Sequence, residues 1–229
     1  METAFGGLFV HKPLWTLSWQ GWLLLLGILS LTFAIAVLNV HRFLSVQAPV
    51  DSRVLVVEGW LPDYALREAA AIFQRDNYDY LLTVGLPLAK GSLLVAYESH
   101  AQVSAETFVK LGIEPSKIFP IALTQRVQRQ RTFAMANRVK EWLADNPLPL
   151  TITRFNLISL DVHSRRSRLL YRQVLGPEIQ IGAIAIPCQD FDPTRWWRES
   201  AGFKLVIFEC LAYFLVRFFL GRPQSPDAV

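Results

Sequence analysis

Residues 155–175 read FNLISLDVHSRRSRLLYRQVL, and this stretch gives the clearest indication of the fold. The first six residues form a largely apolar run that predicts a buried strand. Leu169, Leu170 and Val174 then recur with a helical spacing that can point them toward a core. A strand that passes through a short turn into a helix is the repeating unit of α/β proteins. At such a turn the free backbone N–H groups and the helix dipole favour an anion.

The rest of the body repeats this unit, because apolar strands alternate with amphipathic helices along the chain. Continuous apolar strands are typical of a parallel sheet that helices cover on both faces. Since strand–helix–strand crossovers are right-handed, we expect a doubly wound sheet of about five strands in a three-layer α/β/α arrangement. The strands are expected at residues 53–58, 80–84, 117–121, 155–160 and 181–186, and the helices at 64–76, 96–111, 128–145 and 167–175.

An apolar segment near the start of the chain predicts a membrane anchor at residues 18–40. No charged residue occurs between positions 13 and 40, and the last ~20 of these residues are enough, as a helix, to span the hydrocarbon core. Trp15, Trp19 and Trp22 cluster where the segment begins, as interfacial aromatic residues do. A cleaved signal peptide is the alternative, but the apolar stretch is too long for one and no A-x-A-like cleavage site follows it.

A second apolar segment, residues 201–221, predicts a C-terminal helix. Its Glu209, Tyr213 and Arg217 are spaced by four residues and share one face. A helix that is apolar on nearly all sides is buried or in lipid, and a full membrane span would place the Glu209 carboxylate in the membrane at high cost. We therefore expect this helix to pack on the domain or to lie in the membrane interface. The predicted organisation is an N-terminal flank (1–17), the anchor (18–40), a linker (41–52), the α/β domain (53–200), this helix (201–221) and a disordered tail (222–229).

The candidate site is at the carboxyl ends of the strands, where α/β sheets bind ligands. Four arginines lie within residues 165–172, and the planar fork of arginine matches phosphate or carboxylate groups. A solvated basic helix face is the alternative for these arginines. The candidate ligand-binding residues are Glu58, Gly59, Asp63, Gly85, Arg131, Thr132, Asp161, His163, Ser164, Arg165 and Arg166.

His163 is the candidate for proton transfer, because the charge of histidine changes near neutral pH. It can act as a general base or contact a phosphate, or it can merely cap the helix. Glu58 can accept a hydrogen bond from a ligand hydroxyl, orient Arg165, or form a structural ion pair. Arg131 and Thr132 open a predicted helix, where they can join an anion site or only cap the helix.

The composition excludes several classes of protein. The net charge of +4 is small and forms no basic stripe with interleaved aromatic residues, so nucleic acid is not an expected partner. No Walker loop, G-x-S-x-G motif or zinc-ligand spacing occurs, so no metal site is expected and no cofactor is indicated. Cys188 and Cys210 can pair in an oxidising compartment, but two cysteines do not decide the compartment. Ser99 and His100 are adjacent on a predicted helix, do not face each other, and are expected at the surface.

Four motifs in a fixed order carry a family resemblance. The chain resembles the YdcF/SanA/ElyC family, a domain of unknown function associated with the bacterial cell envelope. The resemblance covers residues 53–209. The motifs are VLVVEGWLPDYAL (54–66), QRTFAMA (130–136), HSRRSRLLYR (163–172) and DFDPTRWWRESAG (190–202).

The resemblance implies a Rossmann-like domain and, for anchored members, a body on the periplasmic side of the inner membrane. The charges around the anchor are nearly balanced between Lys12 before it and Arg42 and Arg53 after it. Taken literally, the positive-inside rule leans toward a cytoplasmic body, and the resemblance implies the opposite.

Two features depart from the family pattern. Many relatives have a glycine-rich turn after the first strand, where this chain has Glu58-Gly59-Trp60. Relatives often have an acidic residue before the Arg-Thr pair, where this chain has Gln130. These departures speak against a simple glycine loop around a phosphate and against acid–base chemistry at position 130.

Two functions from different classes follow from these patterns. The first is a binding or regulatory module that recognises a phosphate-containing envelope metabolite, such as a phosphorylated lipid carrier or a nucleotide-like molecule. The second is a phosphoester hydrolase or transferase acting on such a ligand, with His163 as acid–base and Arg165 and Arg166 as oxyanion clamps. No evident nucleophile occurs, which favours binding. The expected partners are the lipid bilayer through residues 18–40, the ligand and a membrane protein.

Overall fold

The computed structural model describes residues 3–4, 9–10, 17–88, 96–146 and 152–219. The chain forms two compact units, residues 1–39 and residues 40–229. The first unit contains the short antiparallel pair β1 (Thr3–Ala4) and β2 (Phe9–Val10) and most of helix α1 (Trp19–Leu44). Within the described part of the chain, α1 is the one helix that is long and apolar enough to cross a membrane. It matches the predicted anchor and ends four residues later, whereas Trp15 lies outside the described residues.

The second unit is built on a six-stranded sheet with the strand order β3-β8-β7-β4-β5-β6. Strands β4 to β8 are parallel to one another, which confirms the predicted parallel sheet. The sixth strand, β3, lies within the predicted linker and pairs antiparallel with β8 at the sheet edge. The bounds are β3 (Gln47–Ala48), β4 (Val54–Glu58), β5 (Tyr80–Gly85), β6 (Ile118–Ala122), β7 (Arg154–Leu160) and β8 (Gln180–Ile186).

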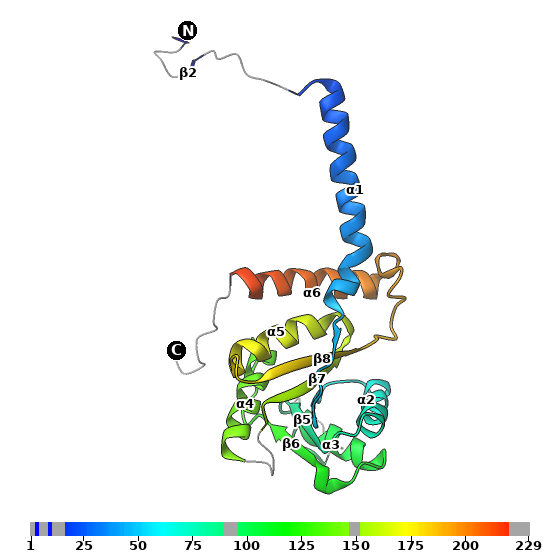
Figure 1. Cartoon of the computed structure of the whole chain (residues 1–229), viewed down its shortest axis with the longest axis vertical. Helices are drawn as coiled ribbons and strands as arrows, with labels where there is room; N and C mark the ends of the chain where they lie inside the picture. Colours follow the sequence, from blue (N-terminus) through cyan, green and yellow to red (C-terminus); the bar gives the residue numbers. More distant parts are fainter. Residues whose placement is uncertain (1–2, 5–8, 11–16, 89–95, 147–151, 220–229) are drawn as a thin grey trace. The chain divides into compact units, whose positions relative to one another are not determined.

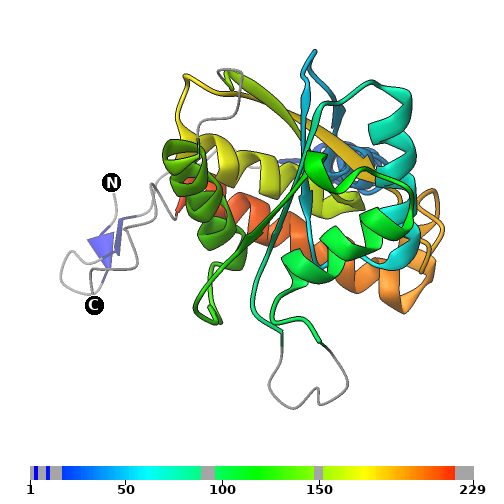
Figure 2. The ribbon, with the colours of Figure 1, turned by 90° about the horizontal axis from the view of Figure 1, so that it is seen from below.

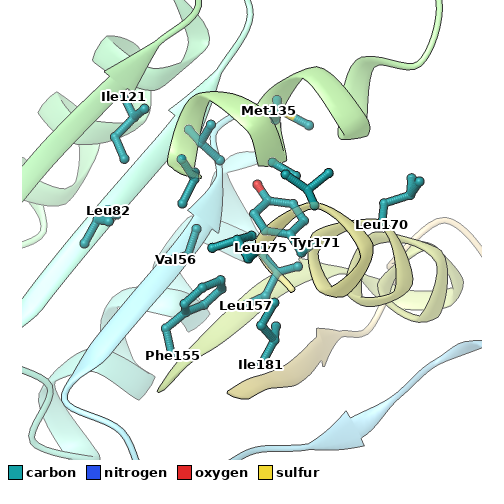
Figure 3. Close-up of a cluster of buried hydrophobic side chains, with 14 of the residues drawn as sticks. Val56, Leu82, Ile121, Met135, Phe155, Leu157, Leu170, Tyr171, Leu175 and Ile181 are labelled. Atoms are coloured by element: carbon teal, nitrogen blue, oxygen red, sulfur yellow. The ribbon is translucent and has the colours of Figure 1, made fainter. Parts of the chain in front are cut away.

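Helices cover both faces of this sheet, as predicted (Figure 2). Successive side chains of a strand point to opposite faces, so along β4 Val54 and Val56 face one helical layer while Leu55 and Val57 face the other. Figure 3 shows the core on the first of these faces, where the Tyr171 ring packs beside Phe155. The first layer contains α4 (Arg131–Asp145) and α5 (Ser164–Leu175), and the second contains α2 (Asp63–Arg75) and α3 (His100–Lys110).

Three helices begin at residues that differ from the predicted ones. Helix α3 begins four residues later than predicted because Ser99 and Gln102 form a capping box, which buries Ser99 instead of leaving it at the surface. Helix α4 begins after Gln130, whose left-handed backbone (φ 54°) interrupts the expected helix. Helix α5 begins three residues earlier than predicted, directly after the 3-10 turn η2 (Asp161–His163).

The C-terminal helix α6 (Ser200–Phe218) packs on the domain, against α5 and η2 (Figure 1). Gly202, Val206, Glu209 and Val216 are buried on its inner face. Trp196, in the short 3-10 turn η3 (Trp196–Arg198) before the helix, is also buried. The predicted tail at residues 222–229 lies outside the described residues.

Candidate functional site at the carboxyl edge of the sheet

The sheet has one point where the strand order reverses. Strands β4 and β7 are neighbours, yet the helices that follow them, α2 and α5, lie on opposite faces. In doubly wound sheets the ligand crevice is at such a switch point. Glu58 ends β4 here. Strand β7 leads through η2 into α5, so residues 163–166 also lie at this position.

Glu58 is a fully buried carboxylate that two hydroxyl groups satisfy. The hydroxyls of Ser159 and Ser167 donate to its two oxygens over 2.6 and 2.9 Å. A buried carboxylate needs such donors because it has lost its water. The pairing with Arg165 that the sequence suggested is not formed, and Glu58 instead joins the ends of β4 and β7 to the first turns of α5.

His163 is held by a carboxylate from the last helix. Its Nδ1 lies 2.9 Å from Oε1 of Glu209, and Arg166 donates from Nε and Nη2 to both oxygens of the same carboxylate over 2.8 and 3.0 Å. Burial alone would raise the pKa of Glu209, but the hydrogen bonds from His163 and Arg166 outweigh it and lower that pKa to about 2. Nη2 of Arg166 also lies 2.9 Å from Nδ1 of His163, and because Nη2 is only a donor, a proton on Nδ1 can be accepted there only by Glu209. The tautomer that has its proton on Nδ1 leaves the lone pair of Nε2 free.

Two oxygen atoms from other elements lie near Nε2 of His163. Oγ1 of Thr132, at the start of α4, is 3.5 Å from this nitrogen, and Oε2 of Glu58, at the end of β4, is 4.0 Å from it. The ring of Trp60, which is 37% exposed, meets the imidazole edge-on with 5.3 Å between ring centroids. A histidine with one nitrogen fixed by a carboxylate and the other beside a hydroxyl has the arrangement that proton transfer requires.

Three of the predicted site residues have a different role, because they bind residues at the end of α1 and directly after it. Asp161, in a left-handed conformation (φ 39°), lies 2.9 Å from Nε2 of His41. The Ser164 hydroxyl accepts a hydrogen bond from the backbone of Val46 and donates to that of Leu44. Arg165 donates to the Phe43 carbonyl, and its guanidinium lies 4.0 Å from the centre of the Phe43 ring. These residues join residues 41–46 to the start of α5.

The two predicted glycines allow α3 to lie close to the ends of β4 and β5. A side chain at Gly59 would come within 2.7 Å of the His100 carbonyl oxygen, and one at Gly85 within 2.5 Å of the Ala101 nitrogen. Both strand ends therefore pack directly on the start of α3. Asp63 is exposed in the first turn of α2, where its negative charge suits the helix dipole.

Three cations without a carboxylate partner lie on the loop between β6 and α4 and at the first residue of α4. Arg126, Arg129 and Arg131 are exposed, and none of them forms an ion pair within the described part of the chain. Arg131 directly precedes Thr132, whose hydroxyl faces His163. Arg131 therefore adds an exposed positive charge directly beside a site residue in the sequence.

The arginines of α5 do not converge on one site. Arg166 is neutralised by Glu209 and Arg165 contacts Phe43, whereas Arg168 donates to the carbonyl of Ile181 near the start of β8. Arg168 and Arg172 line a separate open hollow of about 520 Å³. The residues around His163 thus form a site that includes only one of these arginines.

Sequence reasoning missed Glu209 and Trp60 as members of the site. The available signal for Glu209 was a carboxylate in the middle of an otherwise apolar helix, which requires a buried partner. No group of three metal-ligating side chains occurs among the residues that the structure describes.

The chain matches no protein-family model, and it matches no curated protein.

Proposed function

We propose that this chain is a membrane-anchored protein of the YdcF/SanA/ElyC type that binds a phosphate-containing ligand at the carboxyl edge of its sheet. The ligand class is a phosphorylated lipid carrier or a nucleotide-like metabolite of the cell envelope. The body lies in the periplasm of a bacterium, with α1 in the inner membrane. The four ordered motifs support the family, and the length and composition of α1 support the anchor.

The observation that carries the proposal is the surroundings of Nε2 of His163. A phosphate beside this nitrogen would accept hydrogen bonds from a protonated His163 and from the hydroxyl of Thr132, which lies 3.5 Å from Nε2. Arg126, Arg129 and Arg131 add positive charge that no carboxylate neutralises within the described residues. Phosphate recognition needs this combination of directed donors and local positive potential.

The fixation of Nδ1 by Glu209 favours a second candidate, phosphoester hydrolysis or transfer. In this reaction the oxygen of water or of an acceptor alcohol bonds to phosphorus, and the bond from phosphorus to the ester oxygen breaks. Nε2 takes the proton of the attacking oxygen and gives it to the leaving oxygen. Glu209 stabilises the imidazolium that exists between these two transfers.

The test is a thermal-shift screen of the full chain in detergent, with nucleotides, sugar phosphates and short-chain analogues of lipid-carrier phosphates. A ligand at 100 times its Kd adds about 2.7 kcal/mol of stability, or a Tm increase of roughly 5–10 °C. The shift should disappear in Arg131→Ala combined with His163→Gln and remain in Arg172→Ala, which removes an exposed arginine elsewhere. An equal shift in all three proteins, or no shift from any compound, would count against the binding site.

Release of phosphate from the compounds that bind separates the two candidates. An enzyme should lose about 100-fold or more of its turnover in His163→Gln. Binding without turnover in the unmodified chain would exclude hydrolysis of those compounds and leave recognition as the function.

A further inference from the structure

The outer face of α6 is an exposed, mostly apolar surface that includes the charged side chain of Lys204. The side chains that pack on the body recur at positions 202, 206, 209 and 216, and the opposite arc of the helix faces away from it. Phe208 is 77% exposed and Leu211 is 65% exposed on this outer arc. Soluble surfaces rarely leave such large apolar groups together without a partner. The exposed apolar residues of this face are Phe203, Ile207, Phe208, Leu211, Phe214, Leu215, Phe218 and Phe219.

The charges around this face are positive. Glu209 is the only acidic residue of α6, and it is buried against His163 and Arg166. The exposed charges of the helix are Lys204 and Arg217. A helix with an aromatic, apolar face and exposed basic residues suits a bilayer surface with anionic headgroups. A second copy of the same face would instead bring these like charges together.

The apolar face of α6 is continuous with the end of the membrane helix. Phe43, one residue before the end of α1, belongs to the same compact unit as α6. Its ring meets Tyr213 edge-on at 5.4 Å and lies nearly parallel to Phe214 at 6.4 Å between ring centroids. Since the apolar part of α1 ends only a few residues earlier, a chain anchored through α1 would leave the membrane directly before this face.

We propose that the outer face of α6 docks in the headgroup region of the lipid bilayer and forms a second attachment beside α1. Its inner face holds His163 through Glu209 at 2.9 Å. A helix with its side chains is about 10–12 Å across, so the site would lie roughly one helix diameter from the lipids. If the proposed function is correct, this places a lipid-linked phosphate, rather than a freely diffusing one, closest to Nε2.

The test uses the full chain reconstituted in liposomes of neutral and anionic phospholipids. A nitroxide is attached to Phe208→Cys or Leu211→Cys, with Cys188 and Cys210 replaced by alanine and the Tm checked against the unmodified chain. The matched control is Glu141→Cys, an exposed position on α4. Docking predicts that the α6 labels collide several-fold more with oxygen and several-fold less with a water-soluble nickel complex than the Glu141 label does.

Two outcomes would overturn the docking. Nickel accessibility equal to that at position 141 would place the face in water. Shielding from both oxygen and nickel would mean that protein, such as a second copy of the chain, covers the face. The measurement involves no ligand, so its failure and a failure of the proposed ligand binding are separate results.

Discussion

Replacing the carboxylate of Glu209 is the sharpest test of how α6 is held on the body. Glu209→Gln keeps the shape of the side chain but removes the charge that His163 and Arg166 bind. The pKa of Glu209 falls from 4.5 to about 2 in the folded protein, which corresponds to about 3 kcal/mol of stability at neutral pH. Loss of one partner of a buried ion pair costs a similar amount, about 3–5 kcal/mol.

The effect of this substitution depends on pH in a defined direction. Because the pKa of Glu209 is lower in the folded state, its stabilisation is complete above pH 4.5 and is lost as the pH falls toward about 2. The difference in stability between the unmodified chain and Glu209→Gln should therefore be constant from pH 7 to pH 5. It should shrink by about 1.4 kcal/mol for each further pH unit.

Thermal unfolding of the full chain in detergent, followed by circular dichroism at several pH values, measures both effects. At pH 7 the Tm of Glu209→Gln should be lower by roughly 6–12 °C. Glu141→Gln is the control, because this 60% exposed carboxylate pairs with Arg138 at the surface and should change stability by less than about 0.5 kcal/mol. A Tm within about 2 °C of the unmodified chain, or a difference that stays constant below pH 4, would contradict a stabilising role of the Glu209 charge.

Two further substitutions test the packing at the site and in the core. Gly85→Ala should lower stability by about 2 kcal/mol, because a Cβ there would lie 2.5 Å from the Ala101 nitrogen, whereas Gly27→Ala, with open space around it, should leave the Tm unchanged. Tyr171→Phe should be neutral or stabilising by up to about 1 kcal/mol, because the buried hydroxyl has no hydrogen-bond partner within the described residues. An equal Tm for the two glycine variants, or a Tm that is several degrees lower in Tyr171→Phe, would contradict these explanations.

The periodicity of the chain was sufficient to predict the strands and helices of the body. The strand at 155–160 and a helix after it were both predicted because apolar spacing is a local property of the chain, although the helix begins three residues earlier than predicted. The errors occurred where a side chain or a distant strand competes with that spacing. The capping box of Ser99 moved the start of α3, and pairing with β8 converted part of the predicted linker into β3.

The candidate site was only partly accessible from the sequence. The switch-point rule placed Glu58, Thr132 and His163 at one edge of the sheet, and the structure brings these three together. The same rule also collected Asp161, Ser164 and Arg165, which instead bind residues 41–46. Strand-end position alone does not say to which side of a turn each side chain points.

The parallel α/β architecture and the apolar helix near the start of the chain follow from the amino-acid sequence alone, because hydrophobic period and segment length act locally. The partner of each charged group depends instead on the packing of distant elements. Glu209 lies 46 residues from His163 along the chain, yet their side chains meet at 2.9 Å. A buried carboxylate requires compensating donors but does not specify which ones, and only the packing of α6 across α5 and η2 makes that choice.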